Sequence, residues 1–243
     1  MYQNFTDTKE YISLLLKGVP GTGKTTIAAQ FPNVCIINFD KNLSCLRKLP
    51  LEVQKNIKVV NPFLDEKGVR VKAEKVWDNF TKLLAKVVED ADVKTVVIDS
   101  LTLMASALED DIIGTNNPKA QFKIQDWGTF GRYLKWLGEN LIQAQDRDKN
   151  VIVIAHESVT TDPDTQRVLS YDLSIGGKMK KDFEMYFSNV WKTYIETGVG
   201  VGKKFGYYVR TKPTNLSTCK CSLDLPDVFS FEEQRENIIK QLS

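Results

Sequence analysis

Short apolar runs along the 243-residue chain alternate with segments whose apolar residues recur every three or four positions. The runs have the length and the β-branched content of buried strands. They cover residues 12–17, 34–39, 94–100 and 150–157. The three- and four-residue spacing predicts helices at 24–31, at 72–91 and over a long segment around Phe130 and Leu141. This alternation indicates an α/β fold, with a mainly parallel sheet covered by helices.

The pattern changes near residue 190. Two strand-like segments, 190–196 and 203–211, flank a glycine-rich stretch at 197–202, which predicts an antiparallel hairpin that extends the sheet. Ser230 and Glu233 have the spacing of a capping box for a short C-terminal helix. We therefore expect a core over residues 1–222, and over 223–243 a linker with a short helix that packs on the core.

Composition and charge limit the function classes. The chain is 42% hydrophobic and 26% charged, as in an ordinary globular protein. Its net charge of +2 provides no overall basic field, so a nucleic-acid site would have to be a local patch. No apolar run is long enough for a signal segment or a membrane span. We expect a cytoplasmic protein without a membrane partner.

The strongest chemical signal is the stretch KGVPGTGKTT from Lys17 to Thr26, which contains the pattern G-x-x-x-x-G-K-[ST] between a predicted strand and a predicted helix. Glycines let successive backbone N–H groups converge on an anion. Lys24 can then reach the β- and γ-phosphates and assist catalysis, and the Thr25 hydroxyl can ligate Mg²⁺. The expected nucleotide-binding residues are Gly18, Val19, Pro20, Gly21, Thr22, Gly23, Lys24, Thr25 and Thr26.

Polar residues end the other predicted strands. A carboxylate at the end of an apolar strand needs a cation or donors, so Asp99 is a candidate Mg²⁺ ligand together with Thr25. His156 is a candidate γ-phosphate sensor, with a purely structural role as the alternative, because ligands bind beyond the carboxyl ends of parallel strands. Asp40 is the first candidate for activating water and Glu157 the second. Asn42 can only hydrogen-bond.

In this order of elements the chain resembles RecA-type ATPases, and most closely the short phage-encoded, Sak-type single-strand annealing proteins, over about residues 10–213. The resemblance implies ATP and Mg²⁺ as cofactors, and rings or filaments with ATP at the subunit interface. It implies that Arg210 and Lys212 reach ATP on the neighbouring subunit; a solvated strand end is the alternative. For a phage-encoded chain the location is the host cytoplasm.

The resemblance also implies disordered DNA-binding loops at 111–121 and 157–177, with single-stranded DNA and a single-strand-binding protein as partners. The motif GGKMKKDF adds a cluster of lysines at a predicted helix start, which favours a bound polyanion, although solvated lysines are the more common case. These lysines are Lys178, Lys180 and Lys181.

The sequence departs from the recombinases at one position that matters. They carry a water-activating Glu two residues after the Asp that matches Asp40, whereas this chain has Asn42. One alternative is therefore a slow or non-hydrolysing nucleotide switch that recruits a partner. Another is a P-loop kinase, which needs an arginine-rich lid. The segment 41–71 holds only Arg47 and Arg70, which disfavours the kinase.

Overall fold

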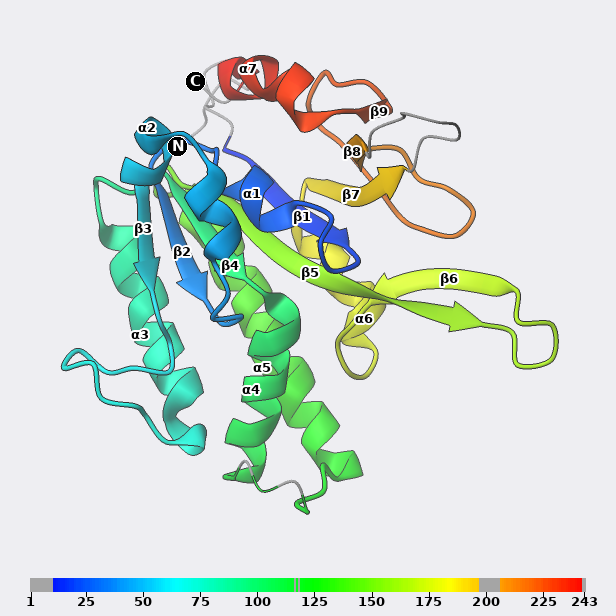
Figure 1. Cartoon of the computed structure of the whole chain (residues 1–243). Helices are drawn as coiled ribbons and strands as arrows, with labels where there is room; N and C mark the ends of the chain where they lie inside the picture. Colours follow the sequence, from blue (N-terminus) through cyan, green and yellow to red (C-terminus); the bar gives the residue numbers. More distant parts are fainter. Residues whose placement is uncertain (1–10, 116, 118, 197–205, 242–243) are drawn as a thin grey trace, which may run out of the picture.

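The computed structural model describes residues 11–115, 117, 119–196 and 206–241. Within these residues, nine strands form one sheet in the order β3-β2-β4-β5-β1-β7-β8-β9, and β6 pairs with β5 (Figure 1). The strands are β1 (Ser13–Gly18), β2 (Val34–Asn38), β3 (Ile57–Val60), β4 (Thr95–Asp99), β5 (Asn150–Thr161), β6 (Val168–Leu173), β7 (Asn189–Glu196), β8 (Gly206–Arg210) and β9 (Val228–Phe229).

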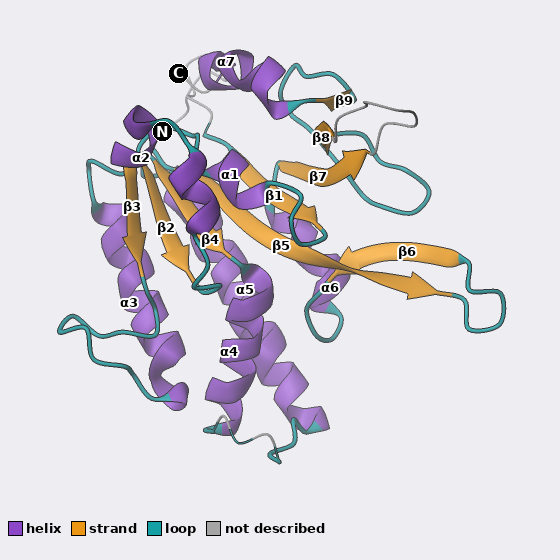
Figure 2. Ribbon diagram, viewed as in Figure 1, coloured by secondary structure: helices purple, strands orange, loops and turns teal. Residues whose placement is uncertain are grey.

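Seven α-helices lie among the described residues, and the long ones share one face of the sheet (Figure 2). They are α1 (Lys24–Ala28), α2 (Leu51–Lys55), α3 (Val76–Glu89), α4 (Leu101–Ile113), α5 (Ile124–Gln145), α6 (Met179–Asp182) and α7 (Phe231–Gln241). Within the described part of the chain, none is long and apolar enough to cross a bilayer.

Successive side chains of a strand point to opposite faces of the sheet, and the apolar ones form one cluster on each face. On β5, Val151 and Val153 pack with α3, α4 and α5, whereas Ile152 and Ile154 pack with α1 and α7. Because both faces are covered, the central strands are apolar on both faces over most of their length, as parallel strands usually are. Strands β3, β2, β4, β5, β1 and β7 are parallel, so their carboxyl ends lie along one edge of the sheet.

The predicted α/β fold is confirmed, with differences at the element ends. Helix α1 ends at Ala28, and Gln30 and Phe31 continue it with tighter turns to the carbonyls of Ile27 and Ala28. The residue before a proline is disfavoured in a helix, and Pro32 follows directly. Residues 73–75 form a 3₁₀ turn before α3.

One expectation from the resemblance is wrong. The segment 157–177 is not a disordered loop, because β5 continues to Thr161 and pairs with β6 as an antiparallel hairpin. Figure 1 shows this hairpin projecting from the end of the sheet. The segment 111–121 likewise begins inside α4, which ends at Ile113 and is followed by Gly114 in the left-handed conformation, with φ of 71°.

The C-terminal part extends the sheet as predicted. Strands β7 and β8 are antiparallel, with Lys192 opposite Arg210, and β9 pairs with β8. The predicted turn at 197–202, with residues 203–205, lies outside the described residues. Phe231 and Ile238 of α7 are buried on the core. The Ser230 hydroxyl bonds Glu232 at 3.3 Å, where the sequence predicted Glu233 as its partner.

Candidate nucleotide site

The phosphate loop connects β1 to α1 and has a conformation that requires glycine. A Cβ atom on Gly18 would lie 2.4 Å from the carbonyl oxygen of Thr193 on β7. Gly23 has a φ of 87°, which side chains other than glycine rarely adopt. The hydroxyl of Thr22 lies 2.6 Å from that of Thr193 and donates to the carbonyl of Val19 at 2.9 Å. The loop is therefore held in close contact with β7.

Lys24 is buried inside this loop. Its Nζ donates to the carbonyls of Gly18 and Val19, both at 2.8 Å. Burial lowers the pKa of Lys24 to about 8, against the opposing effect of the Asp99 charge. A bound triphosphate would place negative charge in direct contact with the ammonium group, so this position suits phosphate binding.

Thr25 and Asp99 form the pair expected at a magnesium site. The Thr25 hydroxyl donates to Oδ2 of Asp99 at 2.7 Å. Burial raises the pKa of Asp99 to about 6, and the bond from Thr25 opposes this rise. A hydroxyl and a carboxylate are oxygen donors of the kind that Mg²⁺ prefers, and a buried carboxylate gains from a cation, so both residues fit the metal.

Replacing Asp99 by Asn should stabilise the unliganded protein while weakening Mg²⁺-nucleotide binding. Because the folded-state pKa is about 6 and the ordinary value is 3.8, the ionised carboxylate costs up to about 3 kcal/mol above pH 6. This cost appears as pH rises from about 4 to 6 and is constant above that range. Thermal unfolding at pH 8 and pH 4 measures it, and the gain should be confined to pH 8.

Asp40→Asn is the matched control for this prediction. The pKa of Asp40 is lowered rather than raised, so its neutralisation should destabilise the protein at pH 8. A melting temperature for Asp99→Asn at or below that of the wild type at pH 8 would contradict the prediction.

Asp40 and His156 meet across the end of β4. Oδ2 of Asp40 lies 3.5 Å from Nε2 of His156, and its Oδ1 accepts a bond from the Ser100 hydroxyl at 2.6 Å. Burial favours a higher pKa for Asp40, but the hydrogen bonds from His156 and Ser100 outweigh it and hold the pKa below its usual value. Asp40 is therefore ionised, with its two oxygens fixed.

These residues line one cleft of about 740 Å³ at the carboxyl ends of β1, β2, β4 and β5. Its polar end holds the phosphate loop, Asp99, Asp40 and His156, and Asn42 also lines it. Further lining comes from a less polar set of residues: Ile27, Cys45, Leu49, Tyr207 and Phe231. The cleft thus offers charged partners for phosphates together with aromatic and aliphatic side chains.

The structure places other predicted residues away from this cleft. The Glu157 side chain is buried on the opposite face of the sheet, 3.1 Å from Nζ of Lys192, because neighbouring residues of a strand face opposite sides. This corrects the expectation that Glu157 orients water. Arg210 and Lys212 are not among the lining residues: the Arg210 guanidinium lies 5.5 Å from the Tyr194 ring centroid, and Lys212 lies 3.9 Å from Asp227.

The three lysines of the predicted patch lie on and beside the one-turn helix α6. Lys178 and Lys181 are exposed, whereas Lys180 is half-buried, with Nζ 3.9 Å from Asp172 of β6. The patch therefore adjoins the β5–β6 hairpin and is separate from the cleft.

Sequence reasoning missed several residues of the site. Ser100 directly follows Asp99 and could have been considered, since a strand-end Asp-Ser pair places a hydroxyl at the same edge. Thr193 supports the loop from a strand that lies far away in sequence. Tyr207 and Phe231 reach the cleft only because β8 and α7 pack beside α1. No local sequence pattern predicts this packing.

This geometry defines a class: a phosphate loop, a Thr–Asp pair and polar strand ends on a mainly parallel sheet are the parts of a P-loop nucleotide-binding site. The family model described as AAA domain matches residues 10–221. This match spans most of the 243 residues, and the chain therefore belongs to that family.

Other comparisons are more distant. No curated protein matches this sequence. Among solved structures, a KaiC-like protein of the hyperthermophilic archaeon Pyrococcus horikoshii is similar, at 18% sequence identity and a TM-score of 0.48. The similarity covers 82% of this chain and 78% of that one.

Proposed function

We propose that this protein is an ATP- and Mg²⁺-dependent ATPase that self-associates, binds single-stranded DNA and promotes strand annealing in phage recombination. The observation that carries the proposal is the meeting of Lys24, Thr25 and Asp99 with Asp40 and His156 in one cleft. Binding, metal and water-handling groups are thereby available to a single triphosphate.

In the mechanism we propose, the loop amides and Lys24 bind the β- and γ-phosphates. Thr25 and Asp99 would hold Mg²⁺, which would neutralise charge on the phosphates. Asp40 accepts a proton from the attacking water, and His156 orients the Asp40 carboxylate and faces the γ-phosphate. A carboxylate with a lowered pKa is a weak base, so we expect slow hydrolysis.

Slow hydrolysis also supports the second candidate function, a nucleotide switch that recruits a partner. Asn42 lines the cleft at the position where the recombinases have a Glu, and an amide cannot accept the proton. In both functions the γ-phosphate state would set the state of assembly.

Self-association with ATP at the subunit interface is supported by two basic residues. Arg210 and Lys212 lie at the end of β8, do not line the cleft of their own chain, and Lys212 has a 62% exposed side chain. We propose that they reach ATP on a neighbouring copy.

We propose that single-stranded DNA binds at the foot of the β5–β6 hairpin, by which we mean the end of the hairpin beside α6. Lys178 and Lys181 are exposed there, whereas the hairpin tip carries Asp162 and Asp164, which would repel phosphates. A single-strand-binding protein remains a further proposed partner.

The test is the thermodynamic coupling between the two ligands. A non-hydrolysable ATP analogue should tighten single-stranded DNA binding about fivefold, and DNA should tighten analogue binding by the same factor. Fluorescence titrations with labelled oligonucleotide and labelled analogue measure both affinities, and ATP turnover is followed with and without DNA. Coupling without turnover would favour the switch, and DNA binding that is absent in both states would overturn the annealing function.

The triple variant Lys178→Ala, Lys180→Ala and Lys181→Ala locates the DNA site. It should weaken binding and reduce the slope of log K against log salt by about 2. Lys82, Lys86 and Lys135 on α3 and α5 are exposed and provide a control with the same charge change. Equal losses in both triple variants would remove the patch from the proposal.

A further inference from the structure

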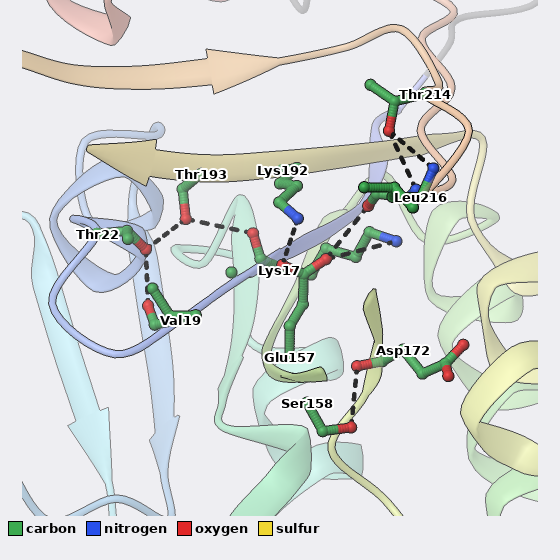
Figure 3. Close-up of polar contacts among 12 residues, drawn as sticks. Lys17, Val19, Thr22, Glu157, Ser158, Asp172, Lys192, Thr193, Thr214 and Leu216 are labelled. Atoms are coloured by element: carbon green, nitrogen blue, oxygen red, sulfur yellow. Dashed lines mark hydrogen bonds and ion pairs between the residues drawn. The ribbon is translucent and has the colours of Figure 1, made fainter. Parts of the chain in front are cut away.

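Four charged side chains meet behind the phosphate loop, on the side of the sheet away from the cleft. Nζ of Lys17 lies 2.8 Å from Glu184 and 3.9 Å from Glu157, and Nζ of Lys192 lies 3.1 Å from Glu157. The side chains of Lys17 and Glu157 are 0% exposed. Figure 3 shows Lys17 and Lys192 pointing toward the Glu157 carboxylate. We call these four residues the buried quartet.

The sheet register explains why a carboxylate is needed beside Lys17 and Lys192. Lys17 and Lys192 are direct partners on the neighbouring parallel strands β1 and β7. Like charges placed side by side on one face of a sheet repel each other. The Glu157 carboxylate pairs with both ammonium groups, which allows β1 and β7 to stay paired at this point.

The same pairing of β1 with β7 supports the phosphate loop. The Lys17 carbonyl accepts a bond from the Thr193 hydroxyl at 3.2 Å, and that hydroxyl lies 2.6 Å from the hydroxyl of Thr22. Figure 3 shows this chain of contacts running from Lys17 through Thr193 to Thr22 and Val19. A shift of β1 against β7 would therefore displace the loop.

The quartet also contacts the foot of the β5–β6 hairpin. Nζ of Lys192 lies 3.4 Å from the centroid of the Tyr171 ring on β6. Glu157 is itself paired with Leu173 of β6, and it accepts a bond from Ser217 at 3.3 Å. The carboxylate that lies within ion-pair distance of both lysines thus belongs to the hairpin, one residue after His156.

We infer that Glu157 is a positioning residue of the nucleotide site, which acts through Lys17 and Lys192 and mechanically joins the β5–β6 hairpin to the phosphate loop. The inference rests on nucleotide binding as proposed above. Glu157 does not touch the nucleotide. It sets the separation of β1 and β7, and through Thr193 and Thr22 the shape of the loop.

Glu157→Gln tests the inference by removing the charge at nearly constant volume. The affinity for a labelled ATP analogue should fall about tenfold, within the range by which residues remote from a ligand alter binding. The double variant Glu157→Gln/Lys192→Met removes one charge of each sign, so it should recover most of the lost affinity. Equilibrium titration gives the affinities, and thermal unfolding reports the stability of each variant.

Lys149→Met is the matched control. Lys149 is also buried, 4% exposed, but it lies just before β5 at the far end of the sheet, where it donates to the carbonyls of Asp90 and Val93 at 2.7 Å. The Lys149→Met variant should be less stable than the wild-type protein and should keep the wild-type affinity for the nucleotide. A purely structural role for Glu157 would give the same result for Glu157→Gln, and that result would overturn the inference.

The outcomes separate the inference from the proposed function. A wild-type protein that fails to bind the analogue refutes the proposed function itself, whereas wild-type binding matched by Glu157→Gln refutes only the inference. Should Glu157→Gln fail to fold, Glu157→Asp decides, since it keeps the charge and withdraws the carboxylate by one methylene. Weaker binding at near-wild-type stability supports the positioning role, and unchanged binding overturns it.

Discussion

Lys24→Ala should bind ATP at least about a hundredfold more weakly than the wild-type protein, since charge-assisted hydrogen bonds to phosphate are each worth about 1.5–3 kcal/mol. Among the described residues, the buried ammonium group bonds the carbonyls of Gly18 and Val19, which are uncharged, so a triphosphate would add an anionic partner. Lys24→Met, which retains the apolar stem, should lose a similar amount. Titration with a labelled analogue measures both variants.

Proton uptake provides an independent readout of the same residue. The pKa of Lys24 is about 8 in the unliganded protein because burial disfavours the charged form. Bound phosphates raise it again, so affinity should fall as pH rises above 8, and binding there should take up a proton. Calorimetry in buffers of different ionisation enthalpy detects this proton, which Lys24→Met should lack. Retained affinity in Lys24→Met would contradict the assignment of the loop.

The polar end of the cleft could be predicted from the sequence because it depends on a simple rule. Parallel strands bring their carboxyl ends to one edge, so residues that end the apolar runs gather there. The rule placed Asp99, Asp40 and His156 correctly at the cleft, and the phosphate-loop pattern placed Lys24 there. It could not predict that Asp40 and His156 pair across β4, because this depends on strand order.

The error over Glu157 has a different origin. Successive residues of a strand face opposite sides, so His156 and Glu157 could not both face the nucleotide. The sequence VIVIAHE predicts that its residues alternate between the two faces of the sheet. Both faces of this strand are apolar up to residue 155, so the sequence does not tell which face carries the nucleotide site. Only the packing of α5 on one side and α1 on the other resolves it.

The β5–β6 hairpin could also have been predicted from the sequence. The segment from Ser158 to Asp172 carries β-branched residues on both sides of the turn sequence Asp-Pro-Asp-Thr, which is a hairpin signal. The expectation of a disordered loop follows from the resemblance to recombinases alone and takes no account of this local signal. By contrast, no local pattern predicts Tyr207 or Phe231, because their place in the cleft follows from the packing of β8 and α7.

Asp40→Asn should lower ATP turnover by about a hundredfold or more while leaving nucleotide affinity unchanged, since positioned bases contribute about 10²–10⁴-fold. The amide keeps the shape of the side chain and its contact with Ser100 but cannot accept a proton from water. Single-turnover rates at saturating ATP, with affinity measured separately, test this. Turnover equal to the wild type in Asp40→Asn would exclude Asp40 as the base.

His156→Gln should have a smaller effect on turnover and a distinct effect on its pH dependence. The bond and charge of His156 help to hold the pKa of Asp40 below its usual value, so their loss should raise that pKa. Turnover is lost where Asp40 becomes protonated, so the acidic limb of the pH profile should move to higher pH. Glu157→Gln should instead lower affinity and leave this limb in place. Asp40→Asn therefore tests proton transfer, His156→Gln tests orientation of the base, and Glu157→Gln tests support of the loop. If the acidic limb does not move in His156→Gln, His156 does not orient the base.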